Sequence, residues 1–115
     1  MNLRVLTCLA IAGLANPAFA HAFLNHADPS AGSTLASAPK RVVLMFSERL
    51  EPAFSGAEVT DRSGRNVETG AVVTRGNSLI VSLRPLPPGK YRVVWHAVSV
   101  DTHRTEGAYS FVVKP

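Results

Sequence analysis

Short runs in which apolar and polar residues alternate recur along the chain, and this pattern constrains the fold more than any other feature. Residues 40–47, 78–83, 90–98 and 108–114 each place apolar side chains at every second position. Because successive residues of a strand face opposite sides, each run predicts a strand with one buried face. No segment shows a helical stripe, and residues 47–55 have room for one loose turn at most. The chain is therefore predicted to be all-β.

Weaker strands are expected at residues 21–26, 56–61 and 66–74, which brings the number to about seven. Seven short strands in one domain favour an immunoglobulin-like Greek-key β-sandwich or barrel. Met45 lies within a predicted strand and is expected to pack in the core. The side chains predicted to form the core faces are Val42, Leu44, Phe46, Leu79, Val81, Leu83, Tyr91, Val93, Trp95, Ala97, Tyr109, Phe111 and Val113.

Turn residues separate these runs. Residues 61–64 and 75–77 contain the glycine and polar residues of hairpin turns, and the proline-rich residues 85–89 predict a rigid connection. Tyr91 follows that connection directly. A tyrosine at such a corner is expected to bond back to the connecting backbone.

Residues 1–20 have the features of a cleaved secretory signal peptide. Arg4 precedes an uncharged apolar stretch over residues 5–15, and Ala18-Phe19-Ala20 is a small-x-small cleavage site. The stretch is too short to span a bilayer. We therefore predict an exported periplasmic domain over residues 21–115, expected to be a monomer.

Two properties of the mature chain limit its chemistry. Cleavage would remove Cys8, the only cysteine, so a metal site would have to use nitrogen and oxygen donors. The formal net charge of the full sequence is +4, but the basic residues are scattered and do not interleave with aromatic residues. Nucleic-acid binding is therefore not expected.

Cleavage after Ala20 leaves His21 with a free α-amine, and this amine and the imidazole Nδ1 can chelate one metal ion. Asp101 and His103 lie two residues apart, so they would project to the same side of an extended chain. An alternative interpretation of this pair is a loop carboxylate beside a surface histidine. Three nitrogens and one carboxylate oxygen together suit tetragonal Cu(II). Zinc could use the same ligands but prefers a tetrahedron, and Ca²⁺ and Mg²⁺ want mostly oxygen.

The remaining candidates favour simpler interpretations. His26 shares strand parity with Leu24 and is expected at the surface or a sheet edge. His96 is expected on a partly exposed face, where a contact to the metal ligands stays open. A single buried Met45 cannot supply the soft donors that Cu(I) prefers, so no Cu(I) site is expected. The glutamates, Glu48 among them, show no pairing that indicates acid–base chemistry.

Four motifs together resemble the copper resistance protein C (CopC) family, over essentially the whole mature chain. They are His21-Ala-x-Leu24, Asp28-Pro-Ser-Ala-Gly-Ser33, Val42-x-Leu-x-Phe-Ser47-Glu-x-Leu50 and Tyr91-x-Val-x-Trp95-x-Ala-Val-Ser99-x-Asp-x-His103-x-x-x-Gly107-x-x-x-Phe111. The resemblance implies a periplasmic sandwich that binds one Cu(II) through His21, Asp101 and His103. It also implies a CopD-type copper permease in the inner membrane as partner. The Met- and His-rich Cu(I) loop of some members has no counterpart between residues 56 and 80.

Three functions of different classes follow from these observations. The leading hypothesis is a copper carrier or buffer that acts in copper homeostasis and resistance and is not an enzyme. The alternative is a histidine-brace copper monooxygenase, which also begins with histidine. Against it stand the small size of the domain and the carboxylate of Asp101, which would occupy a position that oxygen chemistry needs open. A metal-free structural sandwich would leave His21 and the Asp-x-His pair unexplained.

Overall fold

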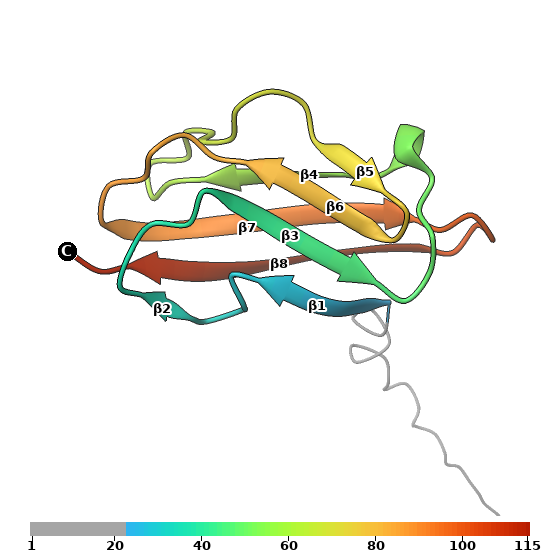
Figure 1. Cartoon of the computed structure of the whole chain (residues 1–115), viewed down its shortest axis with the longest axis horizontal. Helices are drawn as coiled ribbons and strands as arrows, with labels where there is room; N and C mark the ends of the chain where they lie inside the picture. The colour runs from blue at the N-terminus through green and yellow to red at the C-terminus, as the bar shows by residue number, and fades with distance from the viewer. Residues whose placement is uncertain (1–22) are drawn as a thin grey trace, which may run out of the picture.

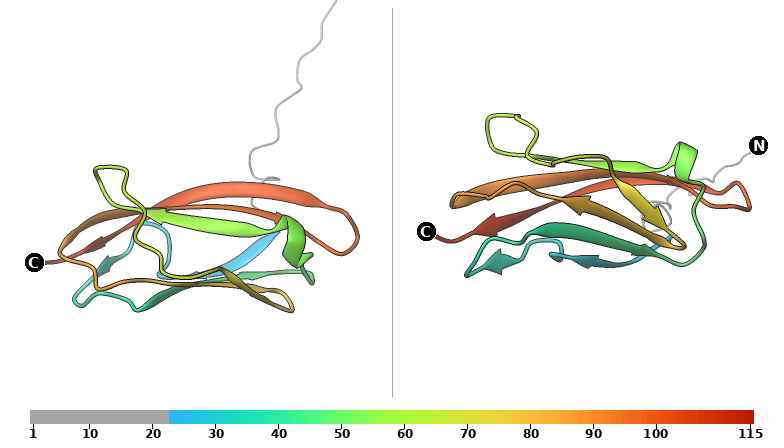
Figure 2. Two further views of the ribbon diagram at one scale, coloured as in Figure 1. Left: turned by 90° about the horizontal axis from the view of Figure 1, so that it is seen from above. Right: turned by 45° about the horizontal axis from the view of Figure 1, so that its top comes forward.

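The computed structural model describes residues 23–115, which form two four-stranded sheets packed face to face (Figures 1 and 2). The first sheet contains, in spatial order, β1 (Leu24–Asp28), β3 (Arg41–Phe46), β6 (Ser78–Ser82) and β5 (Val73–Arg75). The second contains β2 (Thr34–Leu35), β8 (Arg104–Val113), β7 (Gly89–Val98) and β4 (Gly56–Thr60). All neighbours are antiparallel except β2 and β8. The predicted all-β sandwich is confirmed.

The core lies between the two sheets, where the predicted apolar faces meet. Trp95 of β7 is buried, and its ring centroid lies 5.3 Å from that of Phe46 on β3 in an edge-to-face arrangement. The ring of Phe23 also packs against that of Phe46, with their centroids 5.3 Å apart. Of the residues predicted to form the alternating core faces, all are buried except Tyr109, which is partly buried. The aromatic contacts therefore join the start of the described chain to the centre of both sheets.

Several strands differ from their predicted limits. The expected strand over residues 66–74 is reduced to β5, with isolated bridges from Asn66 and Glu68. β8 begins at Arg104, four residues before its predicted start, and β2 was not predicted at all. β2 is only two residues long, so it has no room to show an alternating pattern.

The predicted turns are confirmed. The Oδ1 of Asp61 accepts hydrogen bonds from the backbone N–H groups of Ser63 at 2.9 Å and Arg65 at 3.0 Å, and Gly64 takes the left-handed conformation that closes the turn. The Tyr91 hydroxyl donates to the carbonyl oxygen of Pro87 at 2.5 Å. The one loose turn allowed before β4 is the 3₁₀ helix η1 (Pro52–Phe54).

The predicted burial of Met45 is wrong, since its side chain is 39% exposed. Met45 alternates with the buried residues Leu44 and Phe46, so the pleat directs it to the outer face. The predicted parity of His26 with Leu24 is also wrong. A register shift between these two residues leaves Leu24 packed against the core and His26 exposed on edge strand β1, where a surface histidine was expected.

Two predictions lie outside the described residues: the signal peptide at 1–20 and the position of His21. Across residues 23–115, no helix has the length and apolar character needed to cross a membrane.

Candidate metal centre

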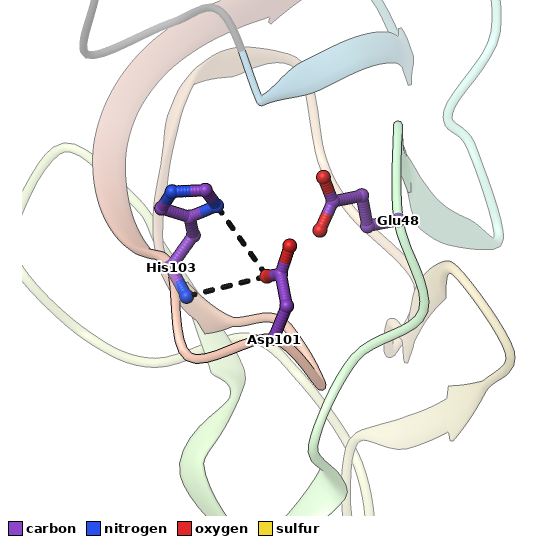
Figure 3. Close-up of side chains that lie close together, drawn as sticks. All are labelled: Glu48, Asp101 and His103. Atoms are coloured by element: carbon purple, nitrogen blue, oxygen red, sulfur yellow. Dashed lines mark hydrogen bonds and ion pairs between the residues drawn. The ribbon is translucent and has the colours of Figure 1, made fainter.

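The loop between β7 and β8 brings Asp101 and His103 together at one end of the sandwich. Asp101 Oδ1 lies 3.4 Å from His103 Nδ1 (Figure 3). The pair was expected to converge because its members lie two apart in an extended chain. The backbone here is instead a tight turn, in which Thr102 has a positive φ of 73°. The side chains therefore meet because the turn folds back, and not because a strand continues.

Ser99 stabilises this turn through hydrogen bonds from its side chain and its backbone. It is completely buried, and its hydroxyl donates to Asp101 Oδ1 while accepting the backbone N–H of His103 at 3.1 Å. The Ser99 backbone N–H also donates to the carbonyl oxygen of His103 at 2.8 Å, and Thr102 N–H donates to the Ser99 carbonyl at 2.8 Å. One buried residue thus fixes the backbone and side-chain positions of both candidate ligands.

The hydrogen bonds also set the charge of Asp101. The bond from the Ser99 hydroxyl is the largest cause that lowers the pKa of Asp101 below its ordinary value, and the backbone N–H of His103 acts in the same direction. The Asp101 carboxylate is therefore ionised at neutral pH and available as an oxygen donor.

Glu48 is a third member of the cluster, and the sequence did not reveal it. Its carboxylate points towards Asp101 from the segment after β3 (Figure 3). Leu50 of that segment forms a bridge with Ser99, and Val100 N–H donates to the Arg49 carbonyl at 2.9 Å. This pairing of residues about fifty positions apart brings Glu48 to the β7–β8 loop. Its only local signal is that it lies just past the end of an alternating run.

One ligand atom each from Glu48, Asp101 and His103 lie within 4.8 Å of one another. Glu48 is partly buried, whereas the side chains of His103 and Asp101 are 74% and 51% exposed. Two carboxylates and an imidazole at this spacing can bind one divalent cation. Because two of the three side chains are exposed, an ion bound here would be open to solvent.

The first described residue, Phe23, is fixed beside the same cluster. Its ring is buried in the core, and its carbonyl oxygen accepts the backbone N–H of Ser47 at 2.9 Å. Ser47 is the immediate neighbour of Glu48. β1 therefore starts at the end of the sandwich that carries the β7–β8 loop, opposite the C-terminus (Figure 1).

The other two described histidines lie outside this cluster. His96 is exposed on β7 in the second sheet, opposite Glu106 of β8, as expected for a face residue. His26 is exposed on β1 in the first sheet and pairs with Met45 of β3. Neither is among the three residues whose ligand atoms converge.

Comparisons with known proteins match nearly the whole chain. A family model described as the CopC domain matches residues 24–114. The chain is 40% identical over 118 residues to Protein YobA of Escherichia coli, covering 98% of this chain and 95% of that one. It is 39% identical to Copper resistance protein C of Escherichia coli, covering 99% and 98%. The crystal structure of CopC from Methylosinus trichosporium superposes with a TM-score of 0.74 at 35% identity, covering 83% of this chain and 95% of that one.

Proposed function

This chain belongs to the CopC family of copper resistance proteins, and on that premise we propose that it carries one Cu(II) ion in the periplasm as a copper carrier or buffer. The observation that supports the proposal most is the convergence of Glu48, Asp101 and His103 beside the start of the described chain. Copper is the cargo of the protein, and no chemical conversion of it is proposed.

His21 is proposed to complete the site with its α-amine and its imidazole Nδ1. Two residues of extended chain span at most about 7 Å, so the Cα of His21 lies within that distance of the Cα of Phe23. Phe23 is hydrogen-bonded to Ser47, next to Glu48. The position of Phe23 thus supports a site in which His21 meets Asp101 and His103.

The proposed donor set favours Cu(II) over other metals. It contains three nitrogens, from the amine and two imidazoles, and the Asp101 carboxylate, with Glu48 next to them. Nitrogen and oxygen donors of this kind suit tetragonal Cu(II), which also leads the affinity order of divalent first-row metals. The folded sandwich holds the described ligands in place before copper arrives, which lowers the entropic cost of binding.

The carboxylates argue against the alternative, a histidine-brace monooxygenase. Oxygen activation needs an open position on copper, whereas Asp101 and Glu48 both direct oxygen donors towards His103. We therefore propose that the chain is a copper carrier and not a copper monooxygenase. An oxygen-uptake assay with ascorbate distinguishes the two, because a carrier consumes no more oxygen than free copper does.

Export and partner complete the proposal. Residues 1–20 are proposed to direct the chain to the periplasm and to be removed, leaving the domain 21–115 with His21 at its amino end. N-terminal sequencing of the protein recovered from the periplasm tests this step. A CopD-type copper permease in the inner membrane is the proposed recipient or donor of the copper.

The ligand assignment is tested by titrating the mature protein with Cu(II) against a competing chelator. We expect His103→Ala to weaken binding most, because nitrogen donors dominate the preference of Cu(II), and Asp101→Ala to weaken it less. His26→Ala and His96→Ala are matched controls that should leave the affinity unchanged. Equal affinities for His103→Ala and His96→Ala would refute the assignment.

A further inference from the structure

The outer face of the first sheet carries a histidine and a methionine as direct cross-strand partners. His26 of β1 pairs with Met45 of β3, and both side chains are exposed. Residues directly opposite each other in an antiparallel pair project to the same face, with Cβ atoms about 4.5–5.5 Å apart. The register shift at Asn25 is what turns His26 outward beside Met45.

We propose that His26 and Met45 form a second metal site, one for Cu(I). A thioether is a soft donor that selects Cu(I), and an imidazole nitrogen also suits copper. Neither group has another role visible in the fold: Met45 is 39% exposed, and within residues 23–115 the imidazole of His26 makes no hydrogen bond or ion pair. Two donors from adjacent strands can bracket one ion of the low coordination number that Cu(I) accepts.

This site is distinct from the one proposed for Cu(II). No residue is shared with the cluster of Glu48, Asp101 and His103. Met45 and Glu48 are three positions apart in the chain, so their Cα atoms lie no more than about 11 Å apart. The two sites would thus occupy the same end of the first sheet and take copper in different oxidation states. The sequence predicted no Cu(I) site because Met45 is a single thioether, was expected to be buried, and is not joined by a Met- and His-rich loop. The structure contradicts only the burial of Met45, and the proposed site therefore uses one thioether with one imidazole.

The test uses the exported protein labelled with [methyl-¹³C]methionine. The sequence contains two methionines, Met1 and Met45, and a Met45→Leu variant identifies the Met45 methyl signal without changing side-chain volume greatly. Ag(I) serves as a redox-stable probe for Cu(I). We expect one equivalent of Ag(I) to shift the Met45 methyl signal, and Cu(I) under anaerobic conditions to shift it likewise.

Two variants make the result decisive. His26→Asn should abolish the shift of the Met45 methyl signal at one equivalent, whereas His96→Asn, which removes an exposed histidine from the other sheet, should preserve it. The titration is repeated in His103→Ala, where the proposed Cu(II) site is damaged. If the Met45 methyl signal still shifts in His103→Ala, the Cu(I) site does not depend on the Cu(II) site. An unmoved methyl signal in the wild type, or an equal shift in His26→Asn, overturns the proposal.

Discussion

At the scale of single residues, Ser99 determines the geometry of the candidate site although it is not proposed to touch the metal. Its buried hydroxyl bonds to the carboxylate of Asp101 and to the backbone of His103, across a turn whose centre, Thr102, has a positive φ. Among residues 23–115, the Ser99 hydroxyl is the one side-chain group that hydrogen-bonds to both Asp101 and His103. The precision of the site therefore depends on a residue in the core.

Replacing Ser99 with alanine should weaken Cu(II) binding by about 10–100-fold, the usual cost of losing a group that orients metal ligands. Ser55→Ala is the matched control, because the Ser55 hydroxyl bonds to the backbone of Val98, the last residue of β7, and not to Asp101 or His103. Chelator competition measures both variants. An unchanged affinity in Ser99→Ala would show that the turn holds its shape without the hydroxyl.

At the scale of strands and turns, alternation predicted most of the fold because half of each strand faces one continuous core. It located β3, β6 and β7 well, and the Tyr91 corner followed from turn chemistry. The prediction for Met45 was wrong because its apolar type was given more weight than its position in the alternation. Met45 follows the buried Leu44 directly, so its side chain faces the other side of the sheet.

The failures at this scale are long-range effects. A bulge reverses the parity of His26, and no local pattern marks it. Glu48 joins Asp101 only because the segment around Leu50 pairs with Ser99. The sequence could thus identify Asp101 and His103 as candidates through their spacing, whereas Glu48 required the tertiary fold.

The β7–β8 pair also requires a glycine. Gly107 lies opposite Trp95, and a Cβ at this position would come within 2.6 Å of Trp95 Cζ2. We expect Gly107→Ala to lower the free energy of unfolding by about 1–3 kcal/mol, the usual cost of overpacking a core. Trp95 is the only tryptophan, so its fluorescence during urea unfolding reports the effect directly. A midpoint equal to that of the wild type would mean that Trp95 moves aside without cost.

At the scale of the whole molecule, the fold joins segments distant in sequence at one end of the sandwich. The start of β1, the segment after β3 and the β7–β8 loop meet there, while the C-terminus lies at the other end (Figure 1). Copper bound at this end would therefore link the amino end of the mature chain to both sheets. Binding should stabilise the fold, because the folded state binds copper more tightly than the unfolded chain does.

The affinity for Cu(II) should fall as the pH decreases from about 8 to 5. Protons compete with copper for a free α-amine, whose reference pKa is about 7.7–8.0, and for imidazoles, with a reference value of about 6.5. Asp101 does not contribute to this fall: its pKa is lowered, chiefly by Ser99, so it stays ionised throughout this range. Chelator competition at several pH values measures the profile, and a flat profile would exclude nitrogen ligands.

In the proposed site, the free amine of His21 and its imidazole hold Cu(II) together with Asp101 and His103. The most direct measurement compares the Cu(II) affinity of the mature protein, which starts at His21, with that of a protein carrying one additional residue before His21. An amide nitrogen cannot readily replace the free amine as a donor, so the extended protein should bind Cu(II) more weakly by orders of magnitude. Equal affinities for the two proteins would refute the role of the His21 amine as a ligand.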